Sequence, residues 1–396
     1  MANSPESLKT TFIQCPVRGP LPFFACPPDE VDPLIEHLRS NVSVDVPVTF
    51  PRGTVLPDGR LDLCKQSLGP EGCQRVVDAL HHNHHVRSLL LGTDGIGDEG
   101  AACLSRFLKS DAALQIVYLG CNGITHVGAR SLAESLRSNQ CVQGLWLKRN
   151  PIGDLGVVEI TRALSGDRTL RVLDLVNTGM GRNGVASICQ WLMRDGCALE
   201  RLYVGGNRLD ADAAKLFAEV LCRNSPLQSL HMNVGAICDS GVTAIAESLR
   251  SNHSLRELGL ASNGITARGA RRLMAVVAEH PTLVHLDLGY SPSTRVLGAQ
   301  PNTLGDEGGK AIAEMLTTNL VLKELNLSKT SVERSGRLAI ENALVENRTL
   351  QRCVIDGGLS PSVQMHLQGN LRSDNGPNTR SPDVMLIRSV YRTNKK

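Results

Sequence analysis

Residues 114–141 read LQIVYLGCNGITHVGARSLAESLRSNQC, and this stretch decides the fold of the chain. The pattern returns directly afterwards at 142–169, as VQGLWLKRNPIGDLGVVEITRALSGDRT, with the same positions apolar. A fixed period of 28 residues is typical of repeat architectures, in which each unit stacks on its neighbours. The predicted repeats start at residues 58, 86, 114, 142, 170, 199, 227, 255, 283, 322 and 350.

Each repeat combines a strand pattern with a helix pattern. In the first half apolar residues alternate, as at Leu145 and Leu147, which predicts a short strand with one buried face. In the second half they are spaced by three and four residues, as at Ala129, Leu132 and Leu136, which predicts an amphipathic helix of about three turns. Turns containing Asn join the halves. We expect their amides to bond the backbone of neighbouring repeats, forming a ladder along the array.

The pattern LxxLxLxxNxI followed by a helix resembles leucine-rich repeats. The long helical half is similar to the ribonuclease-inhibitor subtype, which is also seen in Ran GTPase-activating proteins and in NOD-like receptors. The resemblance covers about residues 58–370. It implies an α/β solenoid of about eleven strand–helix units, a horseshoe with a parallel concave sheet and convex helices. It does not fix a function, because this scaffold carries many unrelated roles.

The sequence divides into three expected segments and one insertion. Residues 1–57 are expected to form an N-terminal cap, partly irregular because it is rich in proline, before the repeats of 58–370. Residues 371–396 lose the period and are expected to be a basic tail that is flexible or loosely docked. The ninth repeat carries an insertion at 290–301, on the rim between strand and helix. Such insertions often mark a binding face, and a harmless loop is the alternative.

Composition excludes several classes of protein and partner. The 396 residues carry a net charge of +3, too balanced to favour nucleic acid or a membrane surface as a bulk electrostatic partner. The start has no apolar signal segment, so we expect a cytoplasmic protein whose twelve cysteines are reduced. No cofactor or metal is expected. The glycine-rich stretches at 95–100 and 305–309 repeat a strand-to-helix turn, and the histidines of 81–85 lack zinc-site spacing.

One strand position places side chains on the concave face. In LxxLxL the residue between the last two leucines points outward, and there stand Tyr118, Trp146 and Tyr203, in a chain with only 3% aromatics. Trp, Tyr and Arg dominate protein interfaces, so we expect a partner-binding strip; cross-strand packing is the alternative. The rim insertion adds Tyr290 and Arg295. The predicted binding residues of the concave face are Tyr118, Trp146, Lys148, Arg149, Asp174, Arg201, Tyr203 and His231.

These features predict a non-enzymatic module that binds a protein partner in its concavity, as a scaffold or inhibitor, and is a monomer or weak dimer. No catalytic residue is predicted. Two other interpretations stay open. The first is a regulator of a small GTPase, which the resemblance to Ran activators implies, although that family typically ends in an acidic segment and this tail is basic. The second is an exported bacterial effector that uses the same surface in a host.

Overall fold

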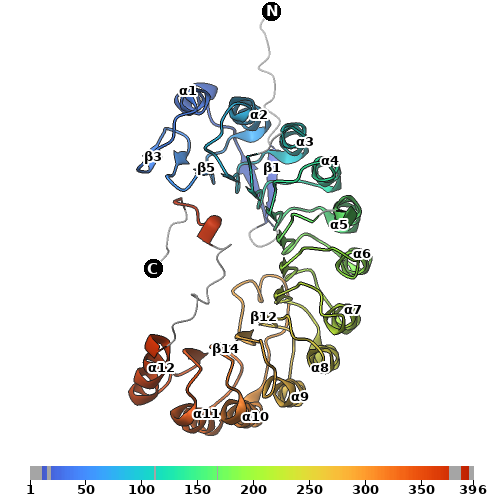
Figure 1. Cartoon of the computed structure of the whole chain (residues 1–396), viewed down its shortest axis with the longest axis vertical. Coiled ribbons are helices and arrows are strands. Elements are labelled where there is room, and N and C mark those ends of the chain that lie inside the picture. The colour runs from blue at the N-terminus through green and yellow to red at the C-terminus, as the bar shows by residue number, and fades with distance from the viewer. Residues whose placement is uncertain (1–10, 16–18, 111–112, 167, 374–384, 392–396) are drawn as a thin grey trace, which may run out of the picture. The chain divides into compact units, whose positions relative to one another are not determined.

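The chain forms two compact units that we describe separately. Unit 1 comprises residues 1–163 and 383–396, and unit 2 comprises residues 164–382. In each unit the helices lie on one side of the strands (Figure 1). We call the opposite side the helix-free face. The computed structural model describes residues 11–15, 19–110, 113–166, 168–373 and 385–391.

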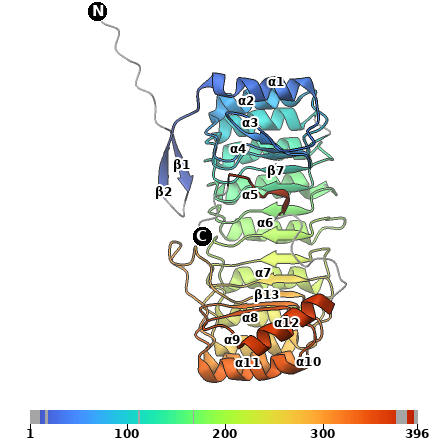
Figure 2. The same cartoon turned by 90° about the vertical axis from the view of Figure 1, so that its left-hand side faces the viewer.

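Unit 1 joins an N-terminal cap to the first repeats. Its elements are β1 (Thr11–Cys15), β2 (Gly19–Phe23), η1 (Pro28–Glu30), α1 (Asp32–Ser40), β3 (Val48–Thr49), β4 (Thr54–Val55), β5 (Arg60–Asp62), α2 (Gly69–Leu80), β6 (Ser88–Leu90), α3 (Gly97–Leu108), β7 (Ile116–Tyr118), α4 (His126–Leu136), β8 (Gly144–Trp146) and α5 (Gly153–Ala163). β1 and β2 form an antiparallel hairpin at the edge of the unit (Figure 2). β3, β4 and β5 are antiparallel, and β5 to β8 are parallel. The cap therefore covers an edge of the sheet that would otherwise expose unpaired backbone.

Unit 2 is a regular run of parallel strands, each followed by a helix. Its elements are η2 (Leu164–Gly166), β9 (Val172–Asp174), α6 (Arg182–Leu192), β10 (Arg201–Tyr203), α7 (Ala211–Cys222), β11 (Ser229–His231), α8 (Cys238–Leu249), β12 (Glu257–Gly259), α9 (Ala267–Val277), β13 (His285–Asp287), α10 (Gly305–Thr318), β14 (Glu324–Leu327), α11 (Arg334–Glu346), β15 (Arg352–Ile355) and α12 (Pro361–Ser373). From β9 to β15 each strand pairs in parallel with the next.

The predicted leucine-rich repeat register is confirmed in both units. Each strand from β5 to β15 begins two residues after its predicted repeat start. The middle residue of each three-residue strand points toward the helices, as at Leu61, Leu89 and Leu145, and is buried. Burying one such side chain contributes about 1.5–3 kcal/mol. Aliphatic side chains stacked at this position explain how the chain builds a core with few aromatic residues.

The predicted asparagine ladder is present in the turns that follow the strands. Asn150 donates from Nδ2 to the carbonyls of Leu119 and Leu147, at 2.8 and 3.0 Å. Its Oδ1 accepts from the backbone of Asn122 and Ile124, at 2.8 and 3.1 Å. One amide thus satisfies four backbone groups in two repeats, and Asn207 makes equivalent bonds in unit 2.

A second asparagine position, absent from the predicted pattern, lies where several of the helices meet the following strand. Asn139 donates from Nδ2 to the Leu108 carbonyl, at the end of the preceding repeat's helix, at 2.8 Å. Its Oδ1 accepts from the two following backbone amides, of Cys141 and Val142. Asn252 repeats this arrangement in unit 2, with the Leu221 carbonyl as acceptor at 2.9 Å. Where this asparagine is present, the end of the helix is therefore linked to the preceding repeat, as also at Asn83, Asn319 and Asn347.

Asp94 replaces the ladder asparagine in the second repeat. Its Oδ1 accepts from the Gln66 backbone at 2.8 Å, as an amide oxygen would. Its Oδ2 stands where an asparagine would place a donor, and this buried atom has no hydrogen-bond partner among the described residues. Burial raises the pKa of Asp94 well above its usual value, although backbone amides oppose the shift. Burial therefore favours the neutral form of this carboxyl group, in which an O–H group can replace the missing N–H.

We expect Asp94→Asn to stabilise the chain at neutral pH. The pKa of Asp94 in the folded state lies above the unfolded value of 3.8. The free-energy penalty on the native state therefore grows as the pH rises above 3.8 toward the folded-state pKa. Asparagine removes this penalty and restores a donor, so the free energy of unfolding should rise by about 1–3 kcal/mol at pH 7.

Denaturant unfolding at pH 4 and pH 7 measures this difference. The exposed Asp45→Asn change serves as the control and should stay within about 0.5 kcal/mol. A variant at Asp94 that is less stable than the parent at both pH values would contradict the assignment.

Candidate functional site

The helix-free face of unit 1 does not present the expected exposed aromatic strip. The residues that end β5 to β8, at the outward position described above, are all buried: Asp62, Leu90, Tyr118 and Trp146. Tyr118 is 8% exposed and Trp146 only 2%. A side chain that is already buried offers little new surface to a partner, so we correct the expectation of an exposed strip at these two residues.

Glycines explain why these rings lie flat. A Cβ atom at Gly144 would overlap the Trp146 ring, and one at Gly92 would overlap the Tyr118 ring. The glycines therefore leave the space that lets each ring lie along the sheet. The Lys148 ammonium lies 5.3 Å from the centre of the Tyr118 ring, a cation–π distance.

Arg149, also predicted to bind a partner, is half-buried and belongs to the turn that precedes the ladder asparagine. Its φ of 58° lies in the left-handed region, like that of Cys121 one repeat earlier at 59°. The backbone of Arg149 therefore forms part of the repeating turn, independently of what its side chain contacts.

Asp62, at the first outward position, is covered by the chain's own C-terminal segment. The backbone amide of Val390 donates to Asp62 Oδ2 at 2.6 Å. Of the flexible or loosely docked tail expected over 371–396, residues 385–391 are docked with defined contacts, whereas 371–373 complete α12. The remaining tail residues, 374–384 and 392–396, lie outside the described part of the chain.

Unit 2 places a ring stack on its helix-free face. Tyr203 and His231 are parallel at 4.8 Å between ring centres and are partly exposed. A Cβ atom at Gly259, the next outward position, would overlap the His231 ring. The glycine thus allows the imidazole to lean along the sheet toward His285, whose ring centre lies 6.5 Å away.

A second outward row, two residues earlier in each strand, carries the charges of this face. Glu257 accepts from Arg201 Nη1 at 2.9 Å and from Ser229 Oγ at 3.0 Å, and it lies 3.5 Å from His231 Nε2. Burial alone would raise the pKa of Glu257, but the hydrogen bond with His231 and the charge of Arg201 outweigh it. The net result lowers that pKa to about 2. Glu257 is therefore an ionised anchor that fixes Arg201 and His231.

The charged row continues to the end of unit 2. Two groups lie near Glu324 Oε2: His285 Nδ1 at 3.6 Å and Arg352 Nη1 at 3.9 Å. Burial lowers the pKa of His285, and the nearby His231 lowers it further. A cavity of about 220 Å³ opens beside these groups, too small for most cofactors but sufficient for one polar side chain. It is lined by His285, Asp287, Glu324, Leu325, Asn326, Ser328, Arg352 and Val354.

The outward aspartates have local structural roles. Asp174 is buried, and its Oδ1 accepts from the Val176 backbone at 2.9 Å. Asp287 accepts from the Gly289 backbone at 3.0 Å and from Asn326 Nδ2 at 2.8 Å. Each carboxylate thus caps the turn that follows its own strand. Asp174 was predicted to bind a partner, and this bond gives it a structural role in its own repeat.

The rim insertion folds down onto unit 2. Thr294 is buried and donates to Ser262 Oγ at 2.7 Å, and Leu297 packs near Gly206. Tyr290 is half-buried beneath the Lys329 ammonium, 4.5 Å from its ring centre, and Arg295 is exposed. Of the two predicted rim residues, Arg295 is the more accessible.

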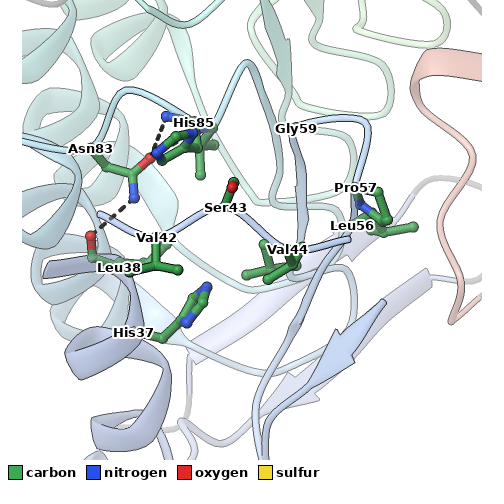
Figure 3. Close-up of a pocket in the computed structure, with 12 residues that line it drawn as sticks. His37, Leu38, Val42, Ser43, Val44, Leu56, Pro57, Gly59, Asn83 and His85 are labelled. Carbon is green, nitrogen blue, oxygen red and sulfur yellow. Dashed lines mark hydrogen bonds between the residues drawn. The ribbon is translucent and has the colours of Figure 1, made fainter. Parts of the chain in front are cut away.

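A small cavity in the cap of unit 1 offers little room for a ligand. Figure 3 shows it between α1 and the turn that follows β4, with His37, Val44, Leu56 and His85 among its lining residues. Its volume is about 80 Å³, well below the roughly 300–1,000 Å³ of small-molecule sites.

The described residues contain no group of three or more His, Cys, Asp or Glu side chains arranged to hold a metal ion. None of the described helices combines the length and apolar character needed to span a bilayer.

The repeats of this chain are similar in sequence to those of known proteins. A family model described as "Leucine Rich repeat" matches residues 251–274. The NACHT, LRR and PYD domains-containing protein 3 of Bos taurus is 29% identical over 167 residues, 42% of this chain and 15% of the relative. The ribonuclease inhibitor of Mus musculus is 26% identical over 166 residues, 41% of this chain and 34% of the relative.

A solved structure, titled as the complex of Rad7 and Elc1 in yeast, is a more distant likeness. It has 16% identity and a TM-score of 0.43, over 70% of this chain and 72% of that one. The matches to the two curated relatives cover at most about a third of those proteins' own lengths.

We expect Gly144→Ala to displace the Trp146 ring, because the added Cβ would overlap it. In a Trp191→Phe background only Trp146 fluoresces as an indole, and acrylamide quenching should increase at least twofold. At Gly369 an added Cβ meets no described atom within 4 Å, so Gly369→Ala is the control. Equal quenching in both variants would show that the glycine does not position the ring.

We expect Glu257→Gln to destabilise unit 2 in a pH-dependent way. The folded-state pKa of about 2 lies below the ordinary 4.5, so the carboxylate stabilises the fold fully above pH 4.5 and loses this effect as the pH falls toward 2. The deficit of the variant should be about 2–3 kcal/mol at pH 7 and should shrink over that interval.

Denaturant unfolding at several pH values tests this expectation. The exposed Glu279→Gln change in the same unit serves as the control. A deficit that does not vary with pH would mean that the ion pairs of Glu257 are not its source.

Proposed function

Because the chain is a leucine-rich repeat protein of the ribonuclease-inhibitor-like type, we propose that it is a protein-binding module whose working surface is the helix-free face of unit 2. The observation that carries this proposal is the combination of two rows on that face. One row supplies the stacked rings of Tyr203 and His231, and the other supplies the charged groups from Arg201 to Arg352. Both rows are partly exposed.

The physical state of these groups favours binding. The network around Glu257 holds Arg201 and the Tyr203–His231 stack in one arrangement before any partner arrives. A preformed surface loses less side-chain entropy on association, which increases affinity. Tyr and Arg are also the residue types that contribute most to protein interfaces.

The proposal is of a binding protein rather than an enzyme. The titratable groups of this face are engaged with one another: Glu257 with Arg201 and His231, and Glu324 with His285. A carboxylate whose pKa is about 2 is a weak base near neutral pH. The alternating charges instead suit a protein surface with complementary charges, which would dock in one register.

We expect Tyr203→Ala to weaken binding of the partner at least tenfold. The variant removes one ring of the stack, and a central aromatic contact is typically worth 2 kcal/mol or more, about 30-fold in affinity. The partner is first captured from a lysate of the source cells with the full chain and then titrated in purified form. Circular dichroism confirms that each variant is folded.

Leu338→Ala is the matched control, because Leu338 is 56% exposed on α11, on the helix side of the same unit. It should bind the partner as the parent does. Loss of binding in Leu338→Ala but not in Tyr203→Ala would assign the working surface to the helices and overturn the proposal.

A further inference from the structure

The C-terminal segment 385–391 is held on unit 1 mainly through its backbone. The Arg60 guanidinium donates from Nη1 to the carbonyls of Met385 and Arg388, at 3.3 and 2.7 Å. The backbone amide of Val390 donates to Asp62 Oδ2 at 2.6 Å. These contacts recognise the main chain of the segment, and many peptide-binding proteins gain affinity from main-chain hydrogen bonds.

Alternate side chains of the segment face the protein. Ile387 and Ser389 are buried, at 3% and 5% exposure, and Ser389 hydrogen-bonds the Cys64 thiol. The Tyr391 hydroxyl makes a hydrogen bond with Thr54 Oγ1 at 2.7 Å. The segment begins with a helical turn, in which the Arg388 amide donates to the Met385 carbonyl at 3.2 Å, and it ends in a second turn. Within it every second side chain, at residues 387, 389 and 391, still contacts unit 1, so these side chains occupy specific positions.

The intervening residues face solvent. Leu386 is 43% exposed and Val390 is 52% exposed, and Arg388 is also exposed. The segment therefore buries one aliphatic side chain, and most of its other contacts are hydrogen bonds that water can replace. Asp62 remains capped by its own turn through Oδ1, which accepts from the Cys64 backbone at 3.1 Å, so its conformation does not depend on the segment.

We propose that Thr54, Arg60, Asp62 and Cys64 form a site for a peptide segment with the pattern aliphatic–x–Ser–x–Tyr, and that residues 387–391 are its resident ligand. The segment occupies the site in the same chain that carries it. A protein that presents the same pattern would compete with it. The site lies in unit 1 and is independent of the surface proposed on unit 2.

The thiol of Cys64 reports whether the segment is docked. Cys64 lies beneath Ser389, and burial raises the pKa of its thiol to about 12, so alkylation is slow in the docked state. In the full chain, Ile387→Asp places a charge in a buried position and should release the segment. Leu386→Asp adds the same charge at an exposed position of the same segment and is the matched control.

We expect iodoacetamide to label Cys64 at least tenfold faster in Ile387→Asp than in the parent or in Leu386→Asp. Peptide mapping by mass spectrometry separates Cys64 from the other cysteines. Equal labelling rates in all three proteins would show that the segment does not cover Asp62 and Cys64, and would overturn the proposal.

A fluorescent peptide with the sequence of residues 384–392 tests the site itself. Fluorescence anisotropy should show binding to Ile387→Asp at least tenfold tighter than to the parent, whose own segment competes at a local concentration on the order of 1 mM. A further Asp62→Asn change replaces an acceptor with a donor and should abolish this binding. Thr54→Val, which removes the bond to Tyr391, should weaken it and serves if Asp62→Asn does not fold.

Three outcomes would contradict the proposal. The peptide fails to bind Ile387→Asp although Cys64 is exposed, or it binds the parent equally well, or neither Asp62→Asn nor Thr54→Val affects it. Light scattering provides the last check. A dimer of the parent that Ile387→Asp dissociates would mean that the segment docks on a second copy instead.

Discussion

The repeats of this chain are joined by amide side chains that bond the backbone of a neighbouring repeat, as at Asn122, Asn150 and Asn207. The strand-to-helix bend puts non-glycine residues into the left-handed region, at Cys121 and Arg149 among others, which costs roughly 1–2 kcal/mol each. The four bonds of Asn150 offset that cost. Because each amide serves an adjacent repeat as well as its own, no repeat is satisfied alone. Other residues take the asparagine position in part of the array: Asp94 and Gln66 near the cap, and Thr178 and Thr330 in unit 2.

Glycine decides what the helix-free faces present. Trp146 and Tyr203 occupy the same position of their repeats, yet one is buried and the other is partly exposed. Trp146 has Gly144 two residues earlier, where its ring can lie flat. Tyr203 has Arg201 at that position and stacks on His231 instead. The chemistry of each face thus follows from small residues next to large ones, as well as from the large residues themselves.

The repeat register of the fold could be predicted from the sequence. Which outward side chains are buried, and which distant segments cover them, could not. Strand starts, helices and the asparagine turns follow from local periodicity. Asn302 confirms the register beyond the insertion by bonding the carbonyls of Leu260 and Leu288. The charged row with Glu257 could have been found by considering both outward positions of each strand. The contact between Val390 and Asp62, 328 residues apart, leaves no periodic signal in the sequence.

The asparagines at the helix ends restrict the cells in which the protein can be produced in its folded form. Asn252 precedes His-Ser and Asn347 precedes Arg-Thr, so both lie in N-glycosylation acceptor sequences. Both side chains are buried, and each donates from Nδ2 to the end of the preceding helix, at the carbonyls of Leu221 and Leu316. A sugar attached at either nitrogen would occupy that place. Production through a secretory pathway that glycosylates nascent chains would therefore block closure of these repeats, whereas a host that does not modify asparagine would leave the fold accessible.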